Sequence, residues 1–124
     1  MKQLEIRASE WSDFLDAFSR QHEGWLVTVE DIPHAAGGSR VEARELPLQG
    51  VFVDDSREHN ISIAVGRTAD DHLTHTISRP TRLIAEQNDA GADEGLTIER
   101  RAGRSTQIRF RAPARPDEVD GVAR

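Results

Sequence analysis

The first part of the chain carries an amphipathic pattern with the spacing of a helix. Large apolar residues recur at i, i+3, i+4 and i+7, which places them on one helical face. This apolar stripe consists of Trp11, Phe14, Leu15 and Phe18, and the opposite polar face of Ser12, Asp13, Asp16 and Ser19. The pattern predicts a helix from about Glu10 to His22, with Ser9 as its N-cap and Gly24 closing its C-terminal end.

Beyond Gly24 the apolar period falls to two, which is typical of strands. The clearest alternation is in residues 60–65, where Ile61, Ile63 and Val65 share one face. The same criterion predicts strands at residues 3–7, 25–30, 41–44, 51–53, 72–78 and 81–86, and a hairpin that pairs residues 96–98 with residues 108–110.

A proline and a glycine interrupt the strand pattern at Pro47 and Gly50. Because proline cannot donate to a central ladder, this position predicts an edge, a bulge or a sharp bend. We therefore expect an α+β fold, with the N-terminal amphipathic helix packed on a strongly bent antiparallel β-sheet or small β-barrel. Residues 1–112 are expected to form this single domain, and residues 113–124 a C-terminal tail that is frayed or lies along the sheet.

Composition narrows the functional classes. The chain has 124 residues, no cysteine and a formal net charge of −6. The lack of cysteine excludes a disulfide scaffold, a thiolate zinc site and a cysteine nucleophile, and it fits a reducing cytoplasm. No apolar run approaches the ~20 residues that cross a bilayer, and the N-terminus lacks the apolar core of a secretory signal. We expect a cytoplasmic protein without membrane binding, and the acidic balance disfavours nucleic acid as a partner.

One polar cluster could bind a ligand. His72, Thr74 and Thr76 share one face of a predicted strand and follow Asp71. This polar row could line a groove for a ligand or a partner backbone. An enzyme in which His72 or His75 is the general base and Asp71 orients it is the alternative. The two histidines point to opposite faces of a strand, which disfavours a shared metal ion. The more ordinary interpretation is that the aspartate caps a loop and that His75 is partly buried.

A second cluster is the arginine hairpin, residues 100–111. Arg109 and Arg111 flank Phe110 and project from one face, and no acidic residue occurs between Arg100 and Arg115. Such a hairpin could dock a phosphate, an RNA backbone or an acidic partner. The ordinary interpretation is a solvated hairpin balanced by nearby acidic residues.

The remaining signals predict no catalytic residue, cofactor or metal site. The glycine pairs lack the lysine and the strand–helix context of a phosphate loop, and no serine lies in a nucleophile elbow. His22, His34 and His59 are expected at the surface or in loops.

Four segments carry a family resemblance: FLDAFSR at residues 14–20, GWLVTVE at 24–30, EARELPL at 42–48 and DHLTHTI at 71–77. Together they resemble an uncharacterised bacterial family, domain of unknown function number fifty-three thirty-five, over roughly residues 9–112. The resemblance implies a small stand-alone bacterial protein and brings no activity, cofactor or catalytic residue. The order of elements is also similar to small bent barrels such as the Sm-like and PRC-barrel folds. We therefore expect a non-catalytic binding or assembly module, with a protein partner or a second copy of the chain as candidates.

Overall fold

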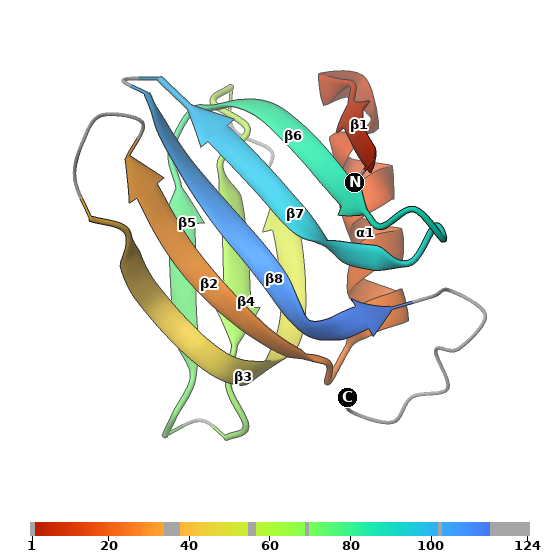
Figure 1. Ribbon diagram of the computed structural model, residues 1–124. Helices are drawn as coiled ribbons and strands as arrows, with labels where there is room; N and C mark the ends of the chain where they lie inside the picture. The colour runs from red at the N-terminus through yellow and green to blue at the C-terminus, as the bar shows by residue number, and fades with distance from the viewer. Residues whose placement is uncertain (1, 34–37, 55–56, 69, 102, 115–124) are drawn as a thin grey trace.

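The computed structural model describes residues 2–33, 38–54, 57–68, 70–101 and 103–114, and for 112–114 the backbone alone. One α-helix and eight strands lie within these residues (Figure 1). They are β1 (Lys2–Ile6), α1 (Trp11–His22), β2 (Leu26–Pro33), β3 (Arg40–Val53), β4 (Ile61–Val65), β5 (Leu73–Ile77), β6 (Pro80–Gln87), β7 (Asp93–Arg100) and β8 (Arg104–Ala114). A 3₁₀ turn at Ala8–Glu10 precedes α1. No helix in the described part is long and apolar enough to span a membrane.

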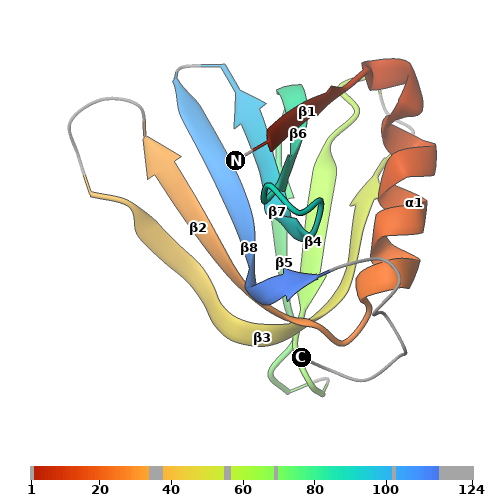
Figure 2. The ribbon, with the colours of Figure 1, turned by 45° about the vertical axis from the view of Figure 1, so that its right-hand side comes forward.

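The strands form one antiparallel sheet in the order β1-β6-β7-β8-β2-β3-β4-β5. Figure 2 shows that the sheet curls strongly and that α1 stands along its open side. The predicted α+β class and the hairpin of β7 and β8 are confirmed. The small-barrel alternative is not, because among the described strands no pairing joins β1 to β5, which leaves an open sheet with two edges.

The bend predicted near Pro47 occurs inside one continuous strand. The first part of β3 pairs with β2 as far as Pro47, and the part from Leu48 to Val53 pairs with β4. The register shifts on both sides of this exchange, and Glu45 just before it has a left-handed φ of 49°. The Pro47 carbonyl accepts a hydrogen bond from the Gly66 N–H at 2.9 Å. The proline is therefore tolerated because β3 changes partners there.

The predicted stripe of α1 packs into the core. Trp11, Leu15 and Phe18 are at most 5% exposed, whereas Phe14 is only partly buried. The helix begins and ends close to the predicted positions. The N-cap prediction was wrong: Glu10 occupies that position without a side-chain hydrogen bond, because the 3₁₀ turn ahead of α1 contains Ser9.

Ser19, predicted on the polar face, is buried against β3. Its hydroxyl donates to the Val51 carbonyl at 3.0 Å and accepts from the Val51 N–H at 2.8 Å. Val51 thus turns both main-chain groups away from its β4 neighbour and toward the helix. In Figure 2 the end of β3 runs beside α1. The helix therefore closes an edge that β2 leaves open when its pairing stops at Pro47.

β8 runs two residues into the segment that was expected to be a tail. Residues 113 and 114, expected in the tail, belong to β8. The rest of the expected tail, residues 115–124, lies outside the described residues and stays a prediction.

Candidate functional site: a pocket between the helix and the sheet edge

Two members of the predicted polar row, Thr74 and Thr76, lie on the edge strand β5, and His72 comes directly before it; all three are exposed. His72 Nε2 is 2.9 Å from Thr74 Oγ1, and the Thr76 hydroxyl is 3.1 Å from that of Ser62 on β4. His75, on the other face, is half-buried, as expected. The structure thus brings three of the four predicted residues onto one surface.

Asp71 caps the loop that precedes β5 and does not join the polar row. Its Oδ1 accepts hydrogen bonds from the Arg67 and Thr68 N–H groups, both at 2.7 Å, and its other oxygen is 3.6 Å from the Arg67 guanidinium. These bonds, from Thr68 above all, hold the pKa of Asp71 below its usual value. This is the loop-capping arrangement that the ordinary interpretation expected.

Acidic residues from neighbouring strands partly balance the positive charge of the arginine hairpin. Arg109 and Arg111 are exposed, and Arg111 Nε lies 3.5 Å from Glu45 Oε1. Arg104 is 3.4 Å from Asp31. The sequence expected acidic neighbours, but these two come from β3 and β2 because β8 pairs with β2 across a long sequence separation.

His22 is the clearest correction. Predicted at the surface, it is fully buried, and its Nδ1 bonds the Phe18 carbonyl at 2.8 Å. Its ring packs against Phe18, Phe110 and Trp25, with centroids 4.5, 4.7 and 5.8 Å away. The available signal was spacing, because position 22 follows Phe18 at i+4 and extends the apolar stripe by one turn. His59 is exposed as expected, and His34 lies outside the described residues.

The other nitrogen of His22 faces a carboxylate. His22 Nε2 is 3.2 Å from Asp93 Oδ2, and no hydrogen bond joins the two atoms. Because a carbonyl oxygen only accepts, the Phe18 contact assigns a proton to Nδ1. Asp93 Oδ1 accepts from Gln87 Nε2 at 3.0 Å. The carboxylate is therefore held by Gln87 of β6, and His22 of α1 packs beside it.

The loop before Asp93 is itself well ordered by hydrogen bonds. Asn88 Oδ1 accepts from the N–H groups of Ala90 and Ala92, each at 3.0 Å, and Gly91 takes the left-handed φ of 84° that the turn needs. The turn between β6 and β7 thus fixes where Asp93 emerges.

The side chain of Asp93 is part of the lining of a pocket of about 260 Å³ between α1, β1, β6 and β7. Its apolar walls are formed by Leu4, Phe14, Ala17, Phe18 and Ala85. Gln21, Gln87 and Asp93 supply polar groups, and Asp93 is 16% exposed. The pocket combines an apolar lining with few polar groups, which is typical of small-molecule sites. Nothing in the sequence pattern indicated it, because its walls come from distant segments.

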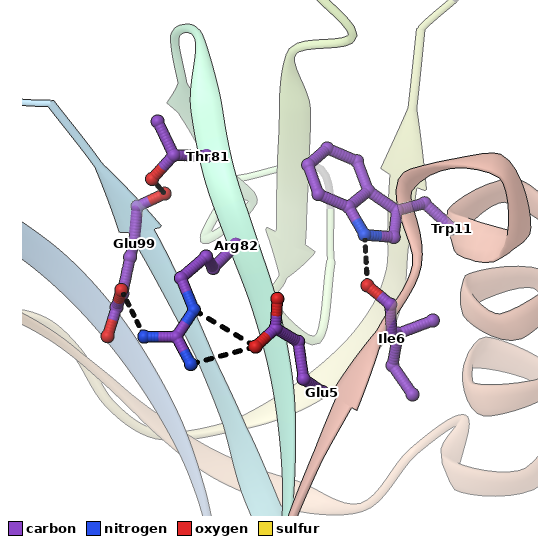
Figure 3. A network of polar contacts seen from close by, with 6 residues as sticks. All are labelled: Glu5, Ile6, Trp11, Thr81, Arg82 and Glu99. Atoms are coloured by element: carbon purple, nitrogen blue, oxygen red, sulfur yellow. Dashed lines mark hydrogen bonds and ion pairs between the residues drawn. The ribbon is translucent and has the colours of Figure 1, made fainter.

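The β1 wall of this pocket is held from two directions (Figure 3). Arg82 donates two hydrogen bonds to Glu5, at 2.8 and 3.2 Å, and bridges to Glu99 at 3.1 Å. The bonds to Glu5 raise the pKa of Arg82. From the helix, the Trp11 indole N–H donates to the Ile6 carbonyl at 2.9 Å. An edge strand of five residues is thereby fixed to both the sheet and the helix.

The fold and the pocket define a small α+β protein in which one helix covers an open antiparallel sheet. A sequence model of the family of unknown function DUF5335 matches residues 2–119, so the chain belongs to this family, as the resemblance of its segments indicated. No curated protein and no solved structure matches the chain. Among the described residues no group of three or more His, Asp or Glu side chains is placed to hold a metal ion.

Proposed function

We propose that the protein is a non-catalytic binding module whose ligand occupies the pocket between α1, β1, β6 and β7. The observation that carries this proposal is the carboxylate of Asp93, which Gln87 holds by a hydrogen bond in the lining of a mainly apolar pocket. A charged group is costly to keep in such surroundings, so its retention favours a role in recognition.

The ligand class is a small amine with an apolar body. A carboxylate has about four acceptor positions, and Asp93 uses only part of them on its protein neighbours. Phe14 and Phe18 form an aromatic wall with ring centroids 6.1 Å apart, and aromatic faces attract cations. The formal net charge of −6 also favours the approach of a cation. The volume of about 260 Å³ limits the ligand to a small molecule.

The burial of His22 supports binding over catalysis at this site. A general base must come within about 3 Å of the proton that it abstracts, directly or through one water. The His22 ring has no exposed surface, and Phe18 and Phe110 cover it. The ring packs in the core beside Asp93.

The test compares 2-phenylethylamine with its neutral counterpart 2-phenylethanol by calorimetry and by amide chemical shifts. We expect the amine to bind and to shift the amides of Ala17 and Ala85. Asp93→Asn keeps the shape of the side chain but removes its charge, and it should weaken amine binding at least tenfold while leaving the alcohol unaffected. Glu94→Gln, the adjacent acid, is the matched control.

The experiment tests two parts of this proposal separately: that the pocket binds a ligand, and that Asp93 recognises an ammonium group. If neither compound shifts the pocket amides, the pocket is not a ligand site and the proposed function is wrong. If the amine binds Asp93→Asn as tightly as the wild type, the pocket binds ligands but does not recognise the ammonium group. Ala17→Leu, which fills the pocket, should abolish binding of both compounds without unfolding the protein.

The arginine hairpin remains the second candidate, for a phosphate or an RNA backbone. Arg109 and Arg111 are exposed on one face, which favours it, but the pairing of Arg111 with Glu45 reduces the free positive charge. Binding through these side chains would weaken steeply with added salt. The bacterial source and the cytoplasmic location expected from the sequence also stay predictions.

A further inference from the structure

We propose that β5 is a self-association edge, on which β5 of a second copy of this chain adds as an antiparallel strand. This inference is independent of the pocket. Of the strands that the structure describes, only β4 pairs with β5, through five successive residue pairs from Val65–Leu73 to Ile61–Ile77. The outer side of β5 is therefore a regular, unpaired strand edge.

This edge lacks the features that keep strand edges apart. Proteins protect edges with charged side chains, prolines, bulges or a covering segment. The sequence of β5, LTHTI, contains no charged residue and no proline, and its pairing with β4 runs without a register shift. The opposite edge differs: β1 contains Lys2 and Glu5, and the Trp11 indole bonds its Ile6 carbonyl.

The side chains of β5 are self-complementary about a two-fold axis at His75. Antiparallel pairing there sets Leu73 opposite the partner's Ile77 on the inner face, so it would cover a leucine that is now 36% exposed. On the outer face, Thr74 stands opposite the partner's Thr76. The Thr76 hydroxyl already contacts that of Ser62 at 3.1 Å, so the new threonine pair extends an existing row of hydroxyl groups.

The segments that flank β5 leave the extended register. Asp71 lies in the turn before the strand and accepts from the Arg67 and Thr68 N–H groups. Arg79, after the strand, has a left-handed φ of 52° and pairs with Glu58 at 3.7 Å. The self-complementary pairing is therefore confined to the five residues of β5.

The test is sedimentation equilibrium from micromolar to millimolar protein. We expect a weak, concentration-dependent dimer of the wild type, because a single strand pairing is a small interface. Thr74→Glu with Thr76→Glu sets like charges opposite each other twice, and the dissociation constant should rise at least tenfold. Thr74→Glu with Thr76→Lys changes the same two positions but sets opposite charges together, and it should restore the dimer. Circular dichroism checks that both variants fold.

Three results would overturn the proposal. One is a wild type that stays monomeric at every concentration. Another is a dimer that persists in Thr74→Glu with Thr76→Glu, because the copies then meet elsewhere. The third is equal dissociation of the two double variants, because charge pairing across the edge then has no role. None of these results bears on amine binding in the pocket.

Discussion

The imidazole of His22 fills the space where the end of α1 meets β8. Aromatic rings surround it, and its two nitrogens face a carbonyl oxygen and a carboxylate. Buried polar atoms are usually hydrogen-bonded; Nδ1 of His22 meets this rule through the Phe18 carbonyl, whereas Nε2 does not. His22 therefore acts as a core residue, packed among aromatic rings beside Asp93.

His22→Ala should lower the free energy of unfolding by about 2–4 kcal/mol, because it leaves a cavity among aromatic rings and removes the neighbour of Asp93. Urea unfolding at neutral pH measures this. His59→Ala, at an exposed position, should change stability by less than about 0.5 kcal/mol. A loss below about 1 kcal/mol for His22→Ala would mean that the ring contributes little to the core.

At the scale of elements, one hydroxyl group of α1 supplies hydrogen bonds to the backbone of β3. Ser19 bonds both main-chain groups of Val51, in the part of β3 that has no strand on that side among the described residues. A helix side chain thus replaces the missing strand partner. The arrangement satisfies the backbone and leaves the helix free to cover the core with Leu15 and Phe18.

Ser19→Ala should cost about 2–4 kcal/mol, which is large for the loss of one oxygen, because it leaves a buried N–H and a buried C=O without a partner. Ser12→Ala, on the exposed face of the same helix, should be neutral or slightly stabilising. Thermal or urea unfolding of the two variants measures the difference. Equal stabilities would show that water or a shifted strand replaces the hydroxyl.

Local patterns predicted the elements well. The helix, the strand at residues 60–65 and the bend near Pro47 all depend on residues close in sequence, where spacing and backbone chemistry decide the outcome. Ser19 was misplaced because a small polar residue is usually exposed on a helix. Its partner Val51 is 32 residues away, so no local pattern could indicate the contact.

The pocket illustrates the same limit. Asp93 lies in a segment for which the sequence predicted no strand, and His22 lies in the last turn of a helix. Only the pairing of β6 with β7 and the packing of α1 bring them within 3.2 Å. By contrast, the exposure of Thr74 and Thr76 followed directly from strand alternation.

At the scale of the whole molecule, the open sheet predicts a gradient of local stability. β8 from Arg104 to Arg109 and β2 from Val27 to Asp31 have strands on both sides, whereas β5 has a neighbour on one side among the described strands. Local openings are easiest where backbone hydrogen bonds and buried contacts are few.

Hydrogen exchange measures this gradient. Amides of β8 should exchange most slowly and those of β5 fastest among the strands, in protein dilute enough to remain monomeric. A five-residue strand with mostly exposed side chains has little to resist opening. Protection of β5 equal to that of β8 would contradict the gradient.

The strand order also has a consequence for synthesis. β8, which follows both of its partners in the chain, inserts between β2 and β7, and its Ile108 pairs with Val29. While the chain emerges from the ribosome, one side of β2 lacks a partner until β8 has been translated. The apolar face of α1 is incomplete for the same period, because Phe18 stacks on Phe110 of β8. The nascent chain thus carries an incomplete core until β8 has emerged, and only then can the sheet become continuous.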